Sequence, residues 1–170
     1  MAIGSLMRFV VLLAVAFAGF GVPAPRAQNE VGGFQVQGWT GAAFLDGRRR
    51  ALSHCAVWTS YGGVGLTFAL APDDQFRIEI GSDDWRLRPG GDYVATLMID
   101  HREPLQIIAA AQSDKRMVVE FGPDDGIIKE LRDGLFLRVL AEHIGISFSL
   151  SGSSQALQRL RSCVNEYRGR

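Results

Sequence analysis

The sequence predicts an α+β fold that is predominantly antiparallel β, sandwich or barrel-like, with a short helix near 126–133 and a C-terminal helix near 153–167 packed on the sheet. Apolar and polar residues alternate over 76–81 and 146–151, which is the period of a strand with one solvent-facing side. Turn residues separate short β-rich segments at the spacing of roughly 8–12 residues that is typical of antiparallel sheets.

The other strands are expected where aromatic, aliphatic and β-branched residues cluster. Segments 93–99 and 117–121 are apolar on both faces, as in the middle of a sandwich or barrel. Weaker candidates are 34–39, 42–45, 55–61, 66–70, 105–111 and 135–140. Turn chemistry lies between them at Gly62-Gly63, Pro72-Asp73-Asp74 and Arg88-Pro89-Gly90-Gly91.

Two segments have the apolar period of a helix. Asp124 or Asp125 is expected to cap the first, and Gly134 follows its end. The second is expected to start at Ser153 or Ser154. The apolar face of the first consists of Ile127, Ile128 and Leu131, and that of the second of Leu157, Leu160, Val164 and Tyr167.

Residues 1–27 have the layout of a bacterial secretory signal: a short basic leader, an apolar run over 9–22 and a segment of small residues and proline. The run is shorter than the ~20 residues of a spanning helix. Cleavage is expected after Ala27, with Ala24 as a rival, leaving one β-rich domain over 28–170 in the periplasm or the medium without stable membrane insertion. The alternative is an uncleaved membrane anchor.

Charge balance excludes one class of partner. The chain has 18 basic and 18 acidic residues and a formal net charge of zero. Binders of nucleic acid need a basic surface that attracts phosphates, so no nucleic acid is expected as a partner.

The two cysteines, Cys55 and Cys163, are expected to form a disulfide, because an even count in an exported protein indicates pairing. The bridge would fasten the closing helix to an early strand. A metal site or a nucleophilic thiol, with His54 beside Cys55, is the alternative.

Motifs for phosphate binding, zinc ligation or an activated serine are not found, so no cofactor and no metal are expected. Residues 62–65 form a glycine-rich turn, with a phosphate cradle as the less favoured interpretation. Three acidic pairs, Asp73-Asp74, Asp83-Asp84 and Asp124-Asp125, suit turns and caps better than a calcium site.

The weak catalytic candidates are His54, Asp100 and His101, because an imidazole oriented by a carboxylate can act as a general base near neutral pH. Trp39 and Trp85 are possible ligand-contact aromatics, since a large ring with a polar edge suits a groove. Trp58, Tyr61 and Tyr93 lie inside expected strands and are expected to pack in the core.

The chain resembles a group of uncharacterised secreted proteins of alphaproteobacteria. The segments that carry the resemblance are Gly38-Trp39-Thr40-Gly41, Ser53-His54-Cys55-Ala56, Leu66-Thr67-Phe68, 85–93, Ile99-Asp100, 148–157, Leu160 and Cys163-Val164. They span nearly the whole chain after the signal. The resemblance implies export and paired cysteines, and it brings no established activity.

These observations favour an exported non-catalytic module that binds a protein or a cell-envelope component. One alternative is a small periplasmic hydrolase that uses His54 or His101 with Asp100. The other is a protease inhibitor that presents a rigid loop, 86–91 or 48–50.

Overall fold

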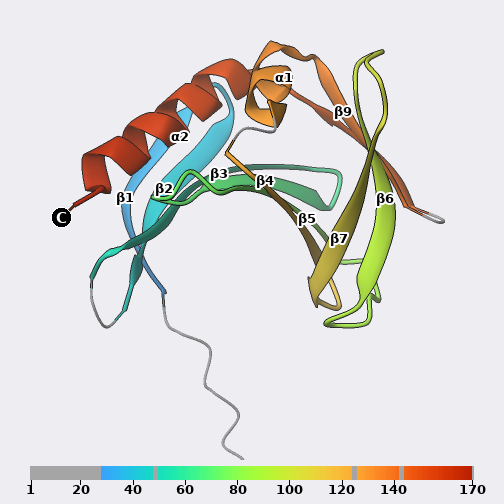
Figure 1. Ribbon diagram of the computed structural model, residues 1–170, viewed down its shortest axis with the longest axis horizontal. Helices are drawn as coiled ribbons and strands as arrows, with labels where there is room; N and C mark the ends of the chain where they lie inside the picture. Colours follow the sequence, from blue (N-terminus) through green and yellow to red (C-terminus); the bar gives the residue numbers. More distant parts are fainter. Residues whose placement is uncertain (1–27, 48–49, 124–125, 142–143, 170) are drawn as a thin grey trace, which may run out of the picture.

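The structure is a computed structural model, and the residues that it describes form ten strands and two helices (Figure 1). The structure describes residues 28–47, 50–123, 126–141 and 144–169, so the expected signal segment lies outside the described residues. The elements are β1 (Gln28–Val36), β2 (Trp39–Asp46), β3 (Leu52–Tyr61), β4 (Val64–Leu70), β5 (Phe76–Ser82), β6 (Asp92–Ile99), β7 (Leu105–Ser113), β8 (Arg116–Phe121), α1 (Ile127–Asp133), β9 (Phe136–Ala141), β10 (Ile144–Ser149) and α2 (Ser153–Tyr167).

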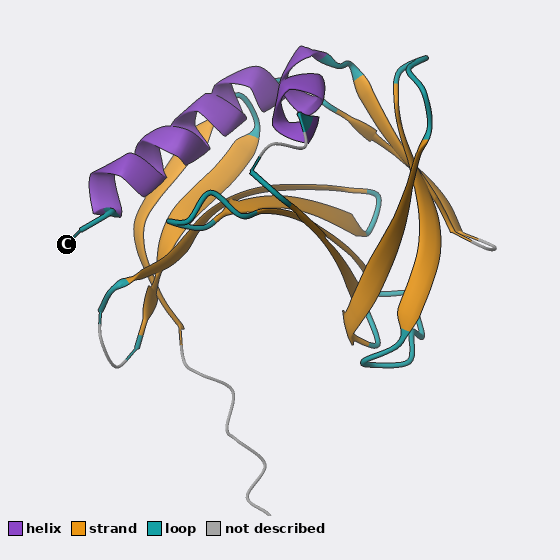
Figure 2. Ribbon diagram, viewed as in Figure 1, coloured by secondary structure: helices purple, strands orange, loops and turns teal. Residues whose placement is uncertain are grey.

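All ten strands belong to one antiparallel sheet, in the order β1-β2-β3-β4-β5-β8-β7-β6-β9-β10. The sheet curls around its core but does not close, so β1 and β10 are its two edges (Figure 2). The predicted α+β class is confirmed. The expected sandwich or barrel is a single curved, open sheet.

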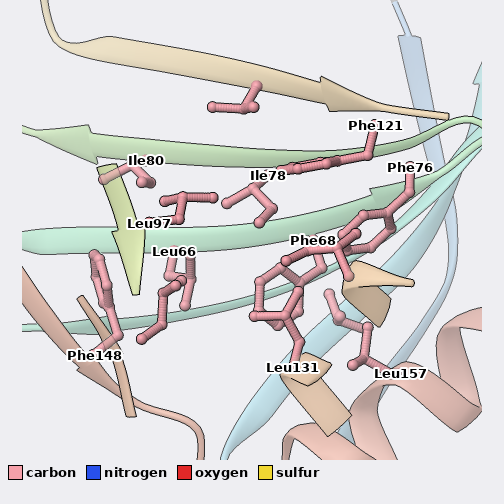
Figure 3. Packing of buried hydrophobic residues seen from close by; sticks show 14 of the residues in the cluster. Leu66, Phe68, Phe76, Ile78, Ile80, Leu97, Phe121, Leu131, Phe148 and Leu157 are labelled. Atoms are coloured by element: carbon pink, nitrogen blue, oxygen red, sulfur yellow. The ribbon is translucent and has the colours of Figure 1, made fainter. Parts of the chain in front are cut away.

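The core lies on the inner face of the curled sheet. Alternation along β4 and β5 places Leu66 opposite Ile80 and Phe68 opposite Ile78, and all four side chains are buried (Figure 3). The ring of Trp39 stacks on Phe68 with centroids 5.0 Å apart. The inner face is therefore continuous across the β4–β5 pair.

Helix α2 packs on this face over β1 to β4, as expected from its apolar stripe (Figure 1). Cys163 on α2 forms a disulfide with Cys55 on β3, with the two Cα atoms 6.2 Å apart. The predicted bridge is confirmed, and the metal and thiol alternatives for Cys55 are wrong because the sulfur is already bonded. The hydroxyl of Ser153 donates a hydrogen bond to the carbonyl of Leu131 at 2.7 Å and joins α2 to α1.

One expected strand is wrong. Segment 34–39 is divided between β1 and β2 by a turn at Gln37 and Gly38, whose φ angles are 47° and 82°. Two consecutive positive φ values are the requirement of a two-residue hairpin loop whose twist matches the strands. The apolar residues on either side, Val36 and Trp39, are paired across the hairpin.

Three smaller expectations also need correction. Trp58, expected in the core, is half-buried on the other face of β3 from buried Val57, because successive side chains of a strand point to opposite faces. Tyr61, expected in the core, is 88% exposed because it is the last residue of β3, where the chain turns. Helix α1 starts after Gly126 with φ of 68°, and the expected caps Asp124 and Asp125 lie outside the described residues. No helix in the described part of the chain is long and apolar enough to cross a membrane.

Candidate functional site

The outer face of the sheet, opposite α2, carries a cleft of about 840 Å³ that we name the polar cleft. Residues of β3 and β5 that alternate with core residues line it. His54 and Trp58 come from β3, and Arg77 and Glu79 come from β5. The pairing of β3 with β4 and of β4 with β5 brings these side chains together from positions about twenty residues apart.

His54 is held in this cleft by three side chains. Its ring stacks on Phe44 at 4.8 Å, Arg77 Nη2 lies 3.2 Å from His54 Nε2, and Ser53 Oγ lies 3.2 Å from Nδ1. Because a guanidinium can only donate, Nε2 accepts and the proton of the neutral ring is on Nδ1. Burial and then the charge of Arg77 lower the pKa of His54 from 6.5 to about 4.

We expect this shift to make stability depend on pH. The unfolded chain protonates His54 below pH 6.5 but the folded chain does so only near pH 4, so the stabilisation is complete above 6.5 and is lost as pH falls. Between pH 7 and pH 5 the wild type should lose about 2 kcal/mol of unfolding free energy relative to His54→Gln. Urea denaturation at several pH values measures the unfolding free energy of each protein. His101→Gln is the control, because this histidine is exposed and its replacement should leave the pH dependence of the wild type unchanged.

Equal pH dependence in wild type and His54→Gln would show that the folded protein protonates His54 as freely as the unfolded chain does.

The structure does not bring the catalytic candidates together. The carboxylate of Asp100 accepts hydrogen bonds from the backbone N–H groups of Leu135, at 3.1 Å, and Phe136, at 2.8 Å, and these bonds lower its pKa. His101 is exposed in the turn after β6. His54 binds Arg77 and Ser53 instead, so it has no orienting carboxylate.

Two of the three acidic pairs named in the sequence contribute an aspartate to ion pairs. Asp74 forms ion pairs with Arg161 and Arg168 of the C-terminal region, and Asp83 pairs with Lys115 at 3.4 Å. Across the described ranges, no group of three or more His, Cys, Asp or Glu residues could hold a metal ion.

Of the two expected inhibitor loops, the structure describes all of 86–91 but only Arg50 of 48–50. Loop 86–91 is tied to β7 by hydrogen bonds from Gly90 N–H to Ala111 C=O and from Ala111 N–H to Gly91 C=O, each 2.8 Å. In loop 48–50, Arg48 and Arg49 lie outside the described residues.

A second cleft, of about 710 Å³, lies between the edge strand β10 and the turns that join β1 to β2 and β3 to β4. We name it the apolar cleft. Its aromatic and aliphatic lining consists of Trp39, Tyr61, Val64, Phe136, Ile146 and Phe148. Tyr61 is 88% exposed and Phe136 is 50% exposed, so a large apolar surface faces solvent here.

The backbone of β10 faces this cleft with hydrogen-bonding groups that no strand in the described part of the chain pairs. Leu150 N–H donates to Leu135 C=O at 2.8 Å, which sets the alternation of the antiparallel ladder between β9 and β10. Phe148 and Ile146 therefore bond to β9, whereas the N–H and C=O groups of Ser149, Ser147 and Gly145 point to the open edge.

The two edges of the sheet differ in protection. Strand β1 has a bulge between Val31 and Phe34, and Gly32 lies against the hydroxyl of Tyr167 on α2. Bulges and covering elements are the usual ways to prevent an edge from pairing with another chain. Strand β10 is regularly paired to β9 over 144–149, and its sequence contains neither lysine nor proline.

The predicted ligand-contact aromatics lie in different places. Trp39 is 2% exposed and its indole N–H donates to Ser151 C=O at 3.0 Å, so it forms part of the floor of the apolar cleft. Trp85 packs half-buried against the core, outside both clefts. Arg77 and Glu79 line the polar cleft but are not among the predicted site residues. Their alternation with buried Ile78 and Ile80 is the signal in the sequence that could have identified them.

Comparison with solved structures shows a similarity of fold. The fold is similar to the crystal structure of invasion associated protein B from Bartonella henselae, with a TM-score of 0.61 and 15% sequence identity over 80% of this chain and 99% of that chain. That organism is an alphaproteobacterium, in agreement with the expected resemblance. No protein-family model and no curated protein matches the sequence. The relation shows the fold alone.

Proposed function

We propose that this chain is an exported, non-catalytic module that binds an extended polypeptide segment of an envelope or partner protein at the edge of β10. The open hydrogen-bonding edge of Gly145, Ser147 and Ser149 carries this proposal. A peptide added as an eleventh strand would satisfy these groups, and its alternate side chains would enter the apolar cleft.

The small size of the residues along the edge of β10 supports the addition of a peptide strand. Gly145, Ser147 and Ser149 are exposed and small, so an incoming strand can approach the backbone without displacing a large side chain. On the other side of the cleft, Tyr61 and Phe136 supply aromatic surface of the kind that dominates protein interfaces. The buried disulfide is compatible with an oxidising compartment such as the periplasm.

The polar cleft gives no comparable support for a hydrolase. A histidine with a pKa of about 4 is a weak base at neutral pH, and its ring nitrogen already accepts a hydrogen bond from Arg77. The carboxylate of Asp100 accepts a hydrogen bond from the backbone N–H of Phe136 on β9. Binding therefore fits these groups better than general base catalysis.

We expect Ser147→Pro to abolish peptide binding while the protein stays folded. Proline removes the outward N–H of Ser147 and places its ring on the edge, and proline is tolerated where an edge N–H faces solvent. A library of random twelve-residue peptides, selected on the wild type, should yield sequences that bind Ser147→Pro at least about tenfold more weakly.

Ser147→Ala is the matched control, because it keeps the backbone N–H and removes only an exposed hydroxyl. It should bind the selected peptides as the wild type does. Selected peptides that bind Ser147→Pro as tightly as the wild type would contradict the proposal, and so would a selection that yields no binding peptide.

A further inference from the structure

The polar cleft holds its hydrogen-bonding groups in fixed positions. Arg77 Nε lies 3.0 Å from Glu79 Oε1, and Arg116 Nη1 lies 3.7 Å from Glu79 Oε2. The Glu79 side chain is only 14% exposed, and Arg77 also donates to His54. Groups that are ordered before a ligand arrives lose little conformational freedom when it binds.

The charges that line the cleft nearly cancel, with four acidic residues against three basic ones. Its acidic residues are Glu30, Glu79, Asp83 and Asp114, its basic residues are Arg77, Lys115 and Arg116, and His54 is neutral at pH 7. Two of the cations pair with Glu79 and the third pairs with Asp83. A cleft of this kind attracts neither anions nor cations strongly, which favours an uncharged polar ligand.

Trp58 gives the cleft an aromatic surface. Trp58 is half-buried and lies beside Phe44, with ring centroids 6.3 Å apart. Gly65 also lines the cleft and pairs with Ser60, two residues along β3 from Trp58. No atom lies within 4 Å of the position that a Cβ of Gly65 would take. The cleft thus offers an aromatic ring next to open space, with carboxylate and guanidinium groups around it.

We propose that the polar cleft binds an uncharged saccharide chain. A sugar ring has an apolar C–H face, which matches the Trp58 ring, and a rim of hydroxyl groups, which Glu79 can accept from and Arg77 can donate to. Ser60 borders both clefts, but Trp58, Arg77 and Glu79 line the polar cleft and not the apolar cleft. The saccharide site therefore uses other binding groups than the peptide site proposed at β10.

The test fills the cleft without disturbing the core. Gly65→Leu places a side chain in the open space of the cleft, and Gly33→Leu makes the same change in β1, where a Cβ also meets no atom within 4 Å. The probes are maltohexaose, cellohexaose and chitohexaose, with hexagalacturonate as the charged comparison. Binding is measured by calorimetry, and the indole N–H signal of Trp58 is followed by NMR.

We expect at least one neutral hexasaccharide to bind and to shift the Trp58 signal. Gly65→Leu should weaken this binding about tenfold or more, whereas Gly33→Leu should leave it unchanged. Trp58→Ala, checked for folding by circular dichroism, should also lose it. The proposal is overturned if none of the three neutral sugars binds, if folded Gly65→Leu binds as the wild type does, or if hexagalacturonate binds more tightly than the neutral sugars.

Discussion

Phe68→Ala is expected to destabilise the protein by about 3–5 kcal/mol, the usual cost of removing a large buried aromatic side chain. Phe68 is fully buried on β4, stacks on Trp39 and lies 5.9 Å from the ring of Phe76. The mutation would leave a cavity between the sheet and α2. Urea denaturation followed by tryptophan fluorescence gives the change in unfolding free energy.

Phe136→Ala is the control, since this ring is 50% exposed and its loss should cost about 1 kcal/mol or less. If Phe68→Ala were no more destabilising than Phe136→Ala, the inner face of β4 would not be the centre of the core.

Replacing Cys55 and Cys163 together by serine is expected to cost about 2–5 kcal/mol. The bridge joins residues 108 positions apart, and a cross-link over a loop of that length reduces the entropy of the unfolded chain strongly. It also fastens α2 to β3, the strand that carries His54 and Trp58. Thermal denaturation with and without dithiothreitol measures the loss.

Reductant should lower the Tm of the wild type to that of the double variant and should leave the variant unchanged. Two free thiols titrating in the folded, oxidised protein would show instead that the bridge is not formed.

Local pattern was sufficient to predict most elements. The period-two alternation over 76–81 predicts β5, and the helical period over 153–167 predicts α2 with its bounds, because each pattern arises from one element packing on one core. The hairpin turn at Gln37 could not be predicted from residue type, because glutamine rarely adopts the positive φ angle that this turn requires.

The order of the strands could not be predicted in the same way. β8 pairs with β5, and β9 pairs with β6, through connections that alternation does not encode. Both clefts depend on this order. Arg77 and His54 meet only through the register of β3, β4 and β5. Strand β10 is an unprotected edge because β9 is its one neighbour among the described strands.

Amide hydrogen exchange by NMR, in the free protein and with a selected peptide bound, tests the proposed role of β10 most directly. In the free protein the N–H groups of Gly145, Ser147 and Ser149 should exchange fast, while those of Ile146 and Phe148, bonded to β9, exchange slowly. Peptide binding should then slow exchange at Gly145 and Ser147. A peptide that binds without slowing exchange at these two amides would contradict strand addition at β10.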